Sequence, residues 1–176
     1  LITLVTGSGV NAETLNYTDG TTHQGVELGF NTKLGNNLLL GGDNLNTNIV
    51  YNYSHFTFDG GIYSGNQIAG IPEHLGYVEL AYQPNDKILI APNIRWQPSN
   101  TYVDHSNTQV QDAFMLLGVK ASYQATDSFR LYADLDNIND ETYQTSYVIR
   151  GISDANQPTF LPGQGFSFSV GATYSW

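Results

Sequence analysis

The chain has 176 residues, carries a formal net charge of −10 with only 6 Lys and Arg residues, and contains no cysteine. These features argue against a nucleic-acid partner and exclude a disulfide framework or a cysteine-based metal site. Only 12% of the residues are charged and 40% are hydrophobic, and no run of about 18 apolar residues exists to form a transmembrane helix. The content of Val, Ile, Leu, Phe and Tyr is nevertheless too high for a disordered chain.

Eight segments alternate between apolar and polar residues, which is the two-residue period of a β-strand with one apolar face. In chain order they are residues 1–6, 26–34, 45–53, 76–82, 87–96, 113–123, 129–135 and 165–176. The first segment starts at Leu1 without Met or a signal peptide, so we expect the chain to begin inside a larger protein. The last segment alternates strictly, and its length suits a membrane-spanning strand of ~9–11 residues better than a soluble strand of ~5–6.

The charges inside these segments share one face. Strand parity puts on the polar face Lys33, Lys87, Arg95, Lys120, Arg130, Glu27, Glu79, Asp134 and Asp136. A charge that faces lipid costs about 2–4 kcal/mol at mid-bilayer, so a membrane barrel requires this segregation, although the core of a soluble sandwich would also produce it. The aromatic ends Tyr51/Tyr53 and Tyr174/Trp176 favour the barrel, because Tyr and Trp suit the membrane–water interface.

The connections between the segments differ in length. Residues 83–86 and 124–127 are short turns and residues 35–43 an intermediate one, whereas the long connections are 7–22, 58–73, 98–112 and 142–163. Short turns on one side and long loops on the other are typical of an outer-membrane barrel, with the turns in the periplasm. The sequence therefore predicts an all-β, antiparallel transmembrane β-barrel fold with about eight strands in this chain and no domain boundary.

Five passages carry a further signal through their order and spacing. They are GTTHQGVELGF (20–30), NQIAGIPEHLGYVELAY (66–82), PSNTYVDHSNT (98–108), LYADLDNINDETY (131–143) and PGQGFSFSVGATYSW (162–176). Together they resemble the C-terminal part of TonB-dependent outer-membrane receptors over nearly the whole chain, and they are similar to the ferric-citrate type of siderophore receptor. One position departs from the family, because Phe166 follows Gly165 where an Arg is common.

The resemblance implies that residues 1–176 form the last part of a 22-stranded barrel, without its plug domain and TonB box. The implied function is that of a non-enzymatic receptor and transporter in the bacterial outer membrane, which imports a metal chelate, usually a ferric siderophore. No resident cofactor is implied. The implied partners are outer-membrane lipid, the remaining barrel strands and the plug, the TonB complex acting through the plug, and the barrel-assembly machinery.

The closing strand has an implied role of its own. In the family, the last strand and its terminal aromatic residue act as the signal that the barrel-assembly machinery reads. The matching residues here are Phe166, Phe168, Tyr174 and Trp176. Interfacial anchoring by Trp176 is a second role that is compatible with the first.

Six residues are candidate ligand contacts: Arg95, Arg150, His105, Asp104, Tyr102 and Gln67. Arg95 points into the lumen by parity and Arg150 lies in the last long loop, and a guanidinium offers a planar, permanently charged fork to the carboxylate or catecholate oxygens of a chelate. Salt bridges to the many acidic residues are the alternative for both. Asp104 and His105 follow Arg95 along one strand toward the mouth, while Tyr102 and Gln67 are further loop candidates.

Other residues with reactive or ligating side chains have plainer explanations. His23, His55 and His74 lie at junctions on the long-loop side, where a chelate contact competes with simple exposure. Calcium is a hypothesis for the acidic loop residues Asp19, Asp59 and Asp104, which are ordinarily solvated. The carboxylate pairs Asp134/Asp136 and Asp140/Glu141 suit a polar lumen and turns better than a glycosidase site. The sequence shows no metal-spaced cluster.

Two alternatives stay open beside the receptor. A self-contained eight-stranded outer-membrane barrel with a structural or adhesive role would close by pairing residues 1–6 with residues 165–176. An outer-membrane enzyme of lipase or protease type would need Ser, His and Asp clustered at one rim, and the sequence offers no such set. Edges that do not pair with each other favour the receptor.

Overall fold

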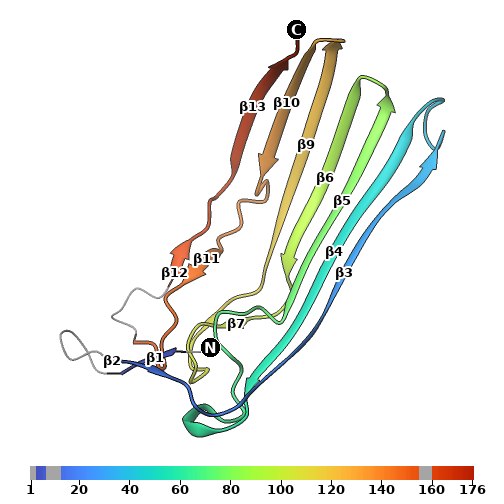
Figure 1. Ribbon diagram of the computed structural model, residues 1–176. Coiled ribbons are helices and arrows are strands. Elements are labelled where there is room, and N and C mark those ends of the chain that lie inside the picture. The colour runs from blue at the N-terminus through green and yellow to red at the C-terminus, as the bar shows by residue number, and fades with distance from the viewer. Residues whose placement is uncertain (1–2, 7–12, 155–159) are drawn as a thin grey trace.

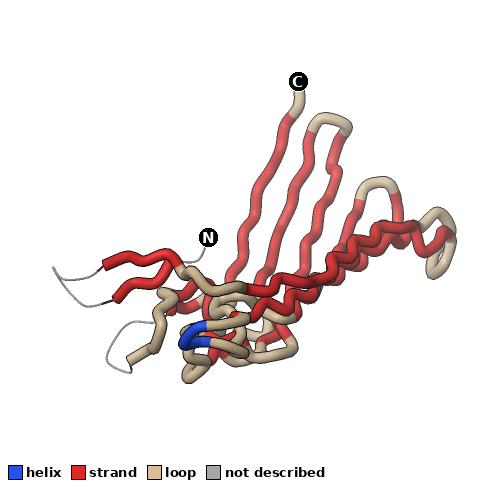
Figure 2. Tube along the Cα trace, turned by 60° about the horizontal axis from the view of Figure 1, so that its bottom comes forward, coloured by secondary structure: helices blue, strands red, loops and turns tan. Residues whose placement is uncertain are grey.

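The computed structural model describes residues 3–6, 13–154 and 160–176. Seven antiparallel strands form one sheet (Figure 1), and the view in Figure 2 shows that this sheet is curved. From one edge to the other the order is β13 (Ser167–Tyr174), β10 (Phe129–Asp136), β9 (Phe114–Thr126), β6 (Ile88–Gln97), β5 (His74–Asn85), β4 (Asn44–Phe58) and β3 (Thr21–Asn36). The sheet is therefore an up-and-down meander, and its strands are antiparallel as the sequence predicts.

Most of the strands are long, and their lengths match a bilayer. β3 has 16 residues, β4 has 15, β9 has 13 and β5 has 12, against ~9–11 residues needed to cross a bilayer. Each predicted segment from 26–34 onward overlaps one of these strands. Lys87 is an exception to the predicted faces, because β6 begins at Ile88 and leaves Lys87 in the preceding turn.

The connections fall at two ends of the sheet. At the turn end, two-residue turns join β5 to β6 and β9 to β10, a longer turn (37–43) joins β3 to β4, and the C-terminus lies there too (Figure 1). At the loop end, the long connections carry a 3-10 helix, η2 (Gly61–Tyr63), and three small hairpins. The hairpins are β1 (Thr3–Thr6) with β2 (Glu13–Asn16), β7 (Thr101–Tyr102) with β8 (Val110–Gln111), and β11 (Gln144–Tyr147) with β12 (Phe160–Pro162).

The segment 1–6 is the main correction to the predicted strands. Its described part, β1, pairs with β2 in a hairpin and not with a strand of the main sheet, while residues 1 and 2 lie outside the described residues. Among the described residues, β3 and β13 are the two edges of the sheet and do not pair with each other. The chain thus supplies seven strands of the wall, and the closure expected of an eight-stranded barrel is not observed in this part of the chain.

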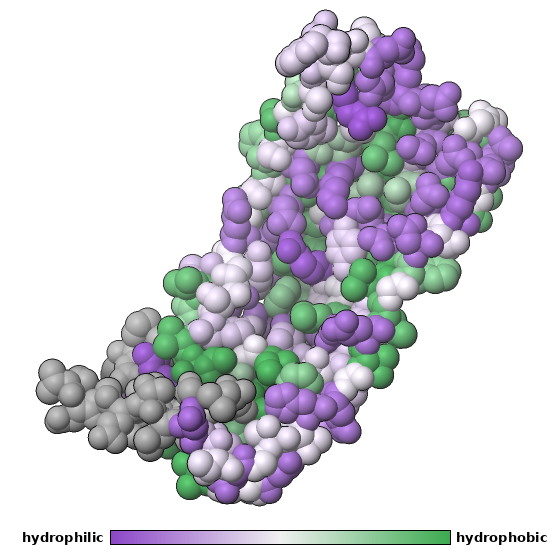
Figure 3. Space-filling view, viewed as in Figure 1, coloured by the Kyte–Doolittle hydropathy of each residue, from purple (hydrophilic) through white to green (hydrophobic). Residues whose placement is uncertain are grey.

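The register of the strands separates two faces. Cross-strand partners share a face, and the polar face carries Lys120 opposite Asp134, Glu79 between Asn48 and Asn93, and Lys33 opposite Asn46. The apolar face carries exposed side chains that include Leu28, Phe30, Ile90, Leu131 and Val170. Figure 3 shows hydrophilic side chains over much of the strand region in one view. The parity inferred from the sequence is therefore confirmed for the charged residues of the strands.

Buried hydrophobic residues are concentrated at the loop end. Phe58, Tyr63 and Ile68 form a core cluster there, with the partly buried Tyr17 and Phe56 packed against it. The strand region is a single layer, so its two faces lack partners within the described residues. Among those residues, no helix is both long and apolar enough to cross a membrane.

Candidate functional site

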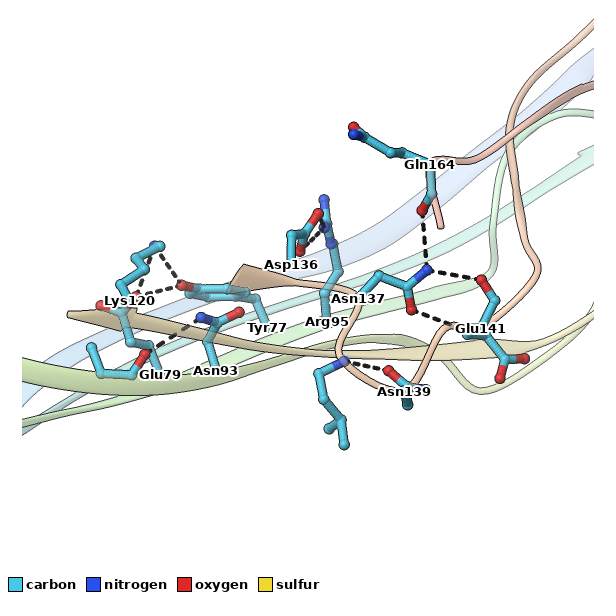
Figure 4. Close-up of polar contacts among 12 residues, drawn as sticks. Tyr77, Glu79, Asn93, Arg95, Lys120, Asp136, Asn137, Asn139, Glu141 and Gln164 are labelled. Carbon is cyan, nitrogen blue, oxygen red and sulfur yellow. Dashed lines mark hydrogen bonds and ion pairs between the residues drawn. The ribbon is translucent and has the colours of Figure 1, made fainter. Parts of the chain in front are cut away.

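The polar face of the sheet carries a network centred on Lys120 of β9. The Lys120 Nζ atom lies 2.9 Å from Oε2 of Glu79 and 3.2 Å from the hydroxyl of Tyr77, both on β5. The Tyr77 hydroxyl in turn donates to Oε2 of Glu79 at 2.6 Å. Figure 4 shows the three side chains grouped on one side of the sheet. The contacts among these three side chains link β5 to β9 across the intervening β6. They hold the charged groups of Lys120 and Glu79 next to each other on this face.

Arg95 lies on the same face and has a partner. Its Nη2 atom donates to both carboxylate oxygens of Asp136, at 3.1 and 3.2 Å, which links β6 to β10 (Figure 4). About half of the Arg95 side chain is exposed nonetheless. The salt bridge that the sequence left as an alternative is thus present, and the guanidinium still reaches the space in front of the polar face.

At the loop end, Asp104 is a buried hydrogen-bonding centre. Its carboxylate, 0% exposed, accepts hydrogen bonds from the backbone N–H groups of Thr108, Gln109 and Ser153 and from the Thr108 hydroxyl. Burial disfavours the charged form, but these hydrogen bonds outweigh it and lower the pKa of Asp104. A buried carboxylate with four donors holds two loops together.

His105 is packed beside that centre between aromatic rings. Its imidazole lies 5.0 Å from the Phe58 ring and 5.6 Å from the Tyr63 ring, centroid to centroid, and is 6% exposed. The Nδ1 atom accepts a hydrogen bond from the backbone N–H of Ala69. Burial lowers the pKa of His105, more than the neighbouring Asp104 raises it, so the ring is neutral at neutral pH.

Backbone groups of the other candidates form hydrogen bonds within this cluster. The Arg150 carbonyl accepts the N–H of His105 at 3.0 Å, and the Tyr102 carbonyl accepts the N–H of Gly70 at 2.7 Å. Gln67 exchanges hydrogen bonds with the side-chain amide of Asn107 through its own N–H and carbonyl. Five of the six candidates thus come together at the loop end from three long loops, and Arg95 lies apart on the sheet.

The histidines outside this cluster have local partners. His23 stacks on Phe56 with 4.5 Å between ring centroids, Nδ1 of His55 lies 3.2 Å from Oε1 of Glu73, and Nδ1 of His74 lies 2.7 Å from the hydroxyl of Tyr51. Within the described ranges, no group of three or more His, Cys, Asp or Glu residues is arranged to hold a metal ion. These histidines therefore act as polar residues of the strand ends.

The carboxylates considered for calcium or catalysis also have local partners. Asp59 accepts a hydrogen bond from the Thr22 hydroxyl at 3.0 Å, Asp134 pairs in register with Lys120, and Oδ1 of Asp140 accepts the N–H of Phe166 at 2.9 Å. In each case the carboxylate serves the strands or the turns around it.

The family of the chain follows from a sequence comparison. A family model described as "TonB dependent receptor-like, beta-barrel" matches residues 1–138. The chain belongs to the TonB-dependent receptor family. Membership places it in the bacterial outer membrane. The apolar face of the sheet consequently meets lipid, and the polar face lines the lumen of the barrel.

Solved structures of receptors have the same fold. The unliganded ferric citrate transporter FecA is 24% identical over 87% of this chain and 24% of its own, with a TM-score of 0.73. The copper transporter OprC is 16% identical over 99% and 27%, with a TM-score of 0.75. The ferric yersiniabactin uptake receptor FyuA from Yersinia pestis is 15% identical over 97% and 32%, with a TM-score of 0.64. The chain spans about a quarter to a third of the length of these receptors.

Two asparagines of this receptor chain matter structurally and were missed from the sequence. Asn107 and Asn137 have positive φ angles of 56° and 52°, a conformation that Asn adopts more readily than most residues. The buried Asn137 side chain donates to the carbonyls of Glu141 and Gln164 and accepts the N–H of Glu141 (Figure 4). The Asn-rich stretch after β10 is the only signal in the sequence, and it does not identify which Asn is buried.

Proposed function

We propose that this chain is the C-terminal part of the barrel of a receptor that imports a metal chelate, with a ferric siderophore as the leading substrate class. The observation that carries the proposal is the half-exposed Arg95 on the lumenal face, below a loop cluster that contains Arg150. An arginine in the loops and another on the lumenal face suit the passage of an anionic chelate, because guanidinium groups bind carboxylate and catecholate oxygens with charge-assisted hydrogen bonds.

The six candidate residues have two roles in this proposal. Arg95, Arg150, Tyr102 and Gln67 keep exposed surface and are the proposed ligand contacts. Asp104 and His105 are buried, and we assign them the role of positioning the loops that carry the contacts. The transported metal belongs to the ligand, so no resident cofactor is needed.

Further barrel strands, a plug domain and the TonB complex are the partners that we propose for this chain. We propose that residues 1–176 assemble with further barrel strands along the edges β3 and β13 and enclose a plug domain through which TonB delivers energy. Phe168 and Tyr174 lie within the terminal strand β13, and Phe166 and Trp176 flank it. We retain them as the proposed signal for the barrel-assembly machinery.

Uptake of radioactive iron tests the proposal. Cells that lack their other ferric receptors and express the full-length receptor are given ferric citrate and a panel of ferric siderophores labelled with ⁵⁵Fe. Arg95→Ala and Arg150→Ala are compared with Arg130→Ala, which removes a guanidinium on the polar face near the turn end, where it contacts Gln124. We expect uptake of one chelate to fall in the first two variants and to stay unchanged in the control.

Unchanged uptake in both test variants would refute the site, whatever the substrate. Uptake of labelled copper but no iron chelate would refute the siderophore assignment while leaving the transporter in place. Surface labelling of the loops confirms that each variant reaches the outer membrane.

A further inference from the structure

The turn between β3 and β4 differs from the other turns of the wall. It contains three consecutive leucines, Leu38, Leu39 and Leu40, whose exposed fractions are 52%, 77% and 56%. We call residues 38–40 the leucine turn. The turns after β5 and β9 contain Asp86 with Lys87 and Asp127 with Ser128 instead. Three adjacent leucines in contact with water would be unfavourable, since apolar area is stabilised by leaving water.

The backbone N–H groups of the leucine turn have hydrogen-bond acceptors within the protein. The buried carboxylate of Asp43 accepts the N–H groups of Leu38, Leu39 and Leu40 at 2.7, 2.8 and 2.8 Å. The same carboxylate accepts the Tyr82 hydroxyl at 3.0 Å. Unpaired donors are what excludes irregular backbone from an apolar medium, and here these three donors are paired within the protein.

The leucine turn also folds over the lipid-facing side of the sheet. A Cβ atom on Gly35 would lie 2.9 Å from Cδ2 of Leu38, so the Leu38 side chain covers the backbone of β3 at this point. Gly35 pairs with Leu45, and Leu45 pairs with Tyr82, which places Leu38 over the apolar face. Leu38 thus adds apolar side-chain surface on the lipid-facing side at the end of β3.

Between the leucine turn and the sheet lies an apolar hollow of about 360 Å³. Leu38 and Leu39 form one wall, and the floor consists of Leu45, Leu80, Tyr82, Ile90 and Pro92. The one hydroxyl among these side chains, that of Tyr82, is bonded to Asp43. An apolar hollow with its polar atom already paired favours a hydrocarbon occupant over water.

A second, larger hollow of about 710 Å³ shares Ile90 with the first. The side chains at its centre are small: Ala121 and Ala133 pair with each other across neighbouring strands. The larger Ile90 pairs with Ala121 on one side, and Val170 pairs with Ala133 on the other. The two hollows therefore lie next to each other on the apolar face, near the turn end. The exposed Lys87, next to Ile88 of the second hollow, adds a positive charge at that end.

We propose that the leucine turn and the hollow it walls form a docking site for an acyl chain of a phospholipid in the inner leaflet of the outer membrane. The turn end faces the periplasm, as in barrels of this class, so the inner leaflet is the one in reach. A lysine beside the hollows suits the phosphate of the headgroup. The inference depends on the membrane location of the family and is independent of which ligand the receptor imports.

Tryptophan fluorescence tests whether the turn contacts lipid. The full-length receptor is reconstituted in phospholipid vesicles with acyl chains brominated near the glycerol or left unmodified. Leu39→Trp is compared with Asp86→Trp at the neighbouring turn, each after subtraction of the parent receptor. We expect the added tryptophan at 39 to lose emission to brominated lipid and to resist aqueous iodide, and the one at 86 to do the reverse. Equal quenching of both by iodide would overturn the proposal.

Native mass spectrometry tests whether the site retains a lipid. The receptor is purified in mild detergent, and the double variant Leu38→Ser/Leu39→Ser is compared with Val26→Ser/Leu28→Ser. The control removes two side chains of the same face that are 51% and 58% exposed and do not line the hollow. We expect the parent and the control to retain a phospholipid that the leucine-turn variant loses.

Equal retention in the two variants would refute the site, as would a bound mass that corresponds to lipid A. A heat-dependent shift in gel mobility shows that each barrel is folded. If the double variant does not fold, the single change Leu39→Ser replaces it, with Leu28→Ser as its control and the same two outcomes.

Discussion

The strand region and the loop end of this chain are stabilised in different ways. In the strand region, backbone ladders hold a single layer, and the Arg95–Asp136 pair on it remains about half exposed. At the loop end, buried polar groups such as Asp104 and Asn137 bind several backbone groups each. The comparison shows that the Arg95–Asp136 pair on the wall keeps about half of its side-chain surface exposed, whereas the buried Asp104 carboxylate fixes the shape of the loops.

The largest effect is expected from Asp104→Ala at the loop end. The substitution leaves the N–H groups of Ser153, Thr108 and Gln109 without their acceptor, and each lost bond to a charged group costs about 1.5–3 kcal/mol. Hydrogen exchange at these amides in the full-length receptor measures the change. We expect exchange there to accelerate by at least about tenfold, which corresponds to 1.4 kcal/mol, while amides of β9 keep their rates.

A control on the wall sharpens this comparison. Asp136→Ala also removes a carboxylate, but an exposed one. Acceleration confined to the loop amides in Asp104→Ala, with none in Asp136→Ala, would support the difference between the regions. Equal exchange rates in both variants and in the parent would contradict it.

Acid is expected to loosen the loop end before the wall. The folded pKa of Asp104 is lowered, so its stabilisation is present above the unfolded value of about 4 and is lost as the pH falls through the folded value. Burial lowers the pKa of His105 as well, so stability at this residue begins to fall as the pH drops below the unfolded value of about 6.5 and continues to fall through the folded value. Burial raises the pKa of the neighbouring Tyr63, so its hydroxyl stays neutral in this range.

Hydrogen exchange at the Ser153 amide, followed from pH 7 to pH 3 and corrected for intrinsic rates, checks this prediction. His105→Gln is expected to remove the loss nearer neutral pH and Asp104→Asn the loss at lower pH. A pH profile that is the same in both variants and in the parent would show that neither group controls the loop end.

The smallest effect is expected from the lumenal pairs. Lys120→Met removes the ion pair with Glu79, which is part of a network but half exposed at the lysine, and exposed ion pairs contribute about 0.2–1 kcal/mol. Thermal unfolding of the full-length receptor is expected to change by a few degrees at most. Arg130→Met, which removes a cation from the same face but no ion pair with another described residue, is the matched control.

The sequence predicts the wall well because its signal is local. The strict alternation before Trp176 and around Lys120 corresponds to β13 and β9, and parity places Arg95 on the polar face. The same local signal gives a wrong prediction at residues 1–6. A strand of a loop hairpin and a strand of the barrel can show the same alternation of apolar and polar residues. β4 extends to Phe58, five residues beyond the predicted segment. The prediction stops too early because these last residues mix Ser, His and Thr with aromatic residues.

The candidate site is less predictable because its contacts are distant in sequence. Asp136 lies 41 residues from Arg95, and Ser153 lies 49 residues from Asp104. Parity identifies the face of Arg95 but not its partner, which depends on the order of β6, β9 and β10. The burial of Asp104 and His105 depends on how three loops pack, and residue type alone does not reveal it.

The central claim is that one face of this sheet meets lipid and the other lines a polar lumen. The most direct measurement is a scan of single cysteines through residues 117–123 of β9 in the full-length receptor, since this chain has no cysteine of its own. We predict that residues 117, 119, 121 and 123 react with a lipid-soluble maleimide, and that 118, 120 and 122 react with a water-soluble one. Water-soluble labelling of both sets alike would contradict the account.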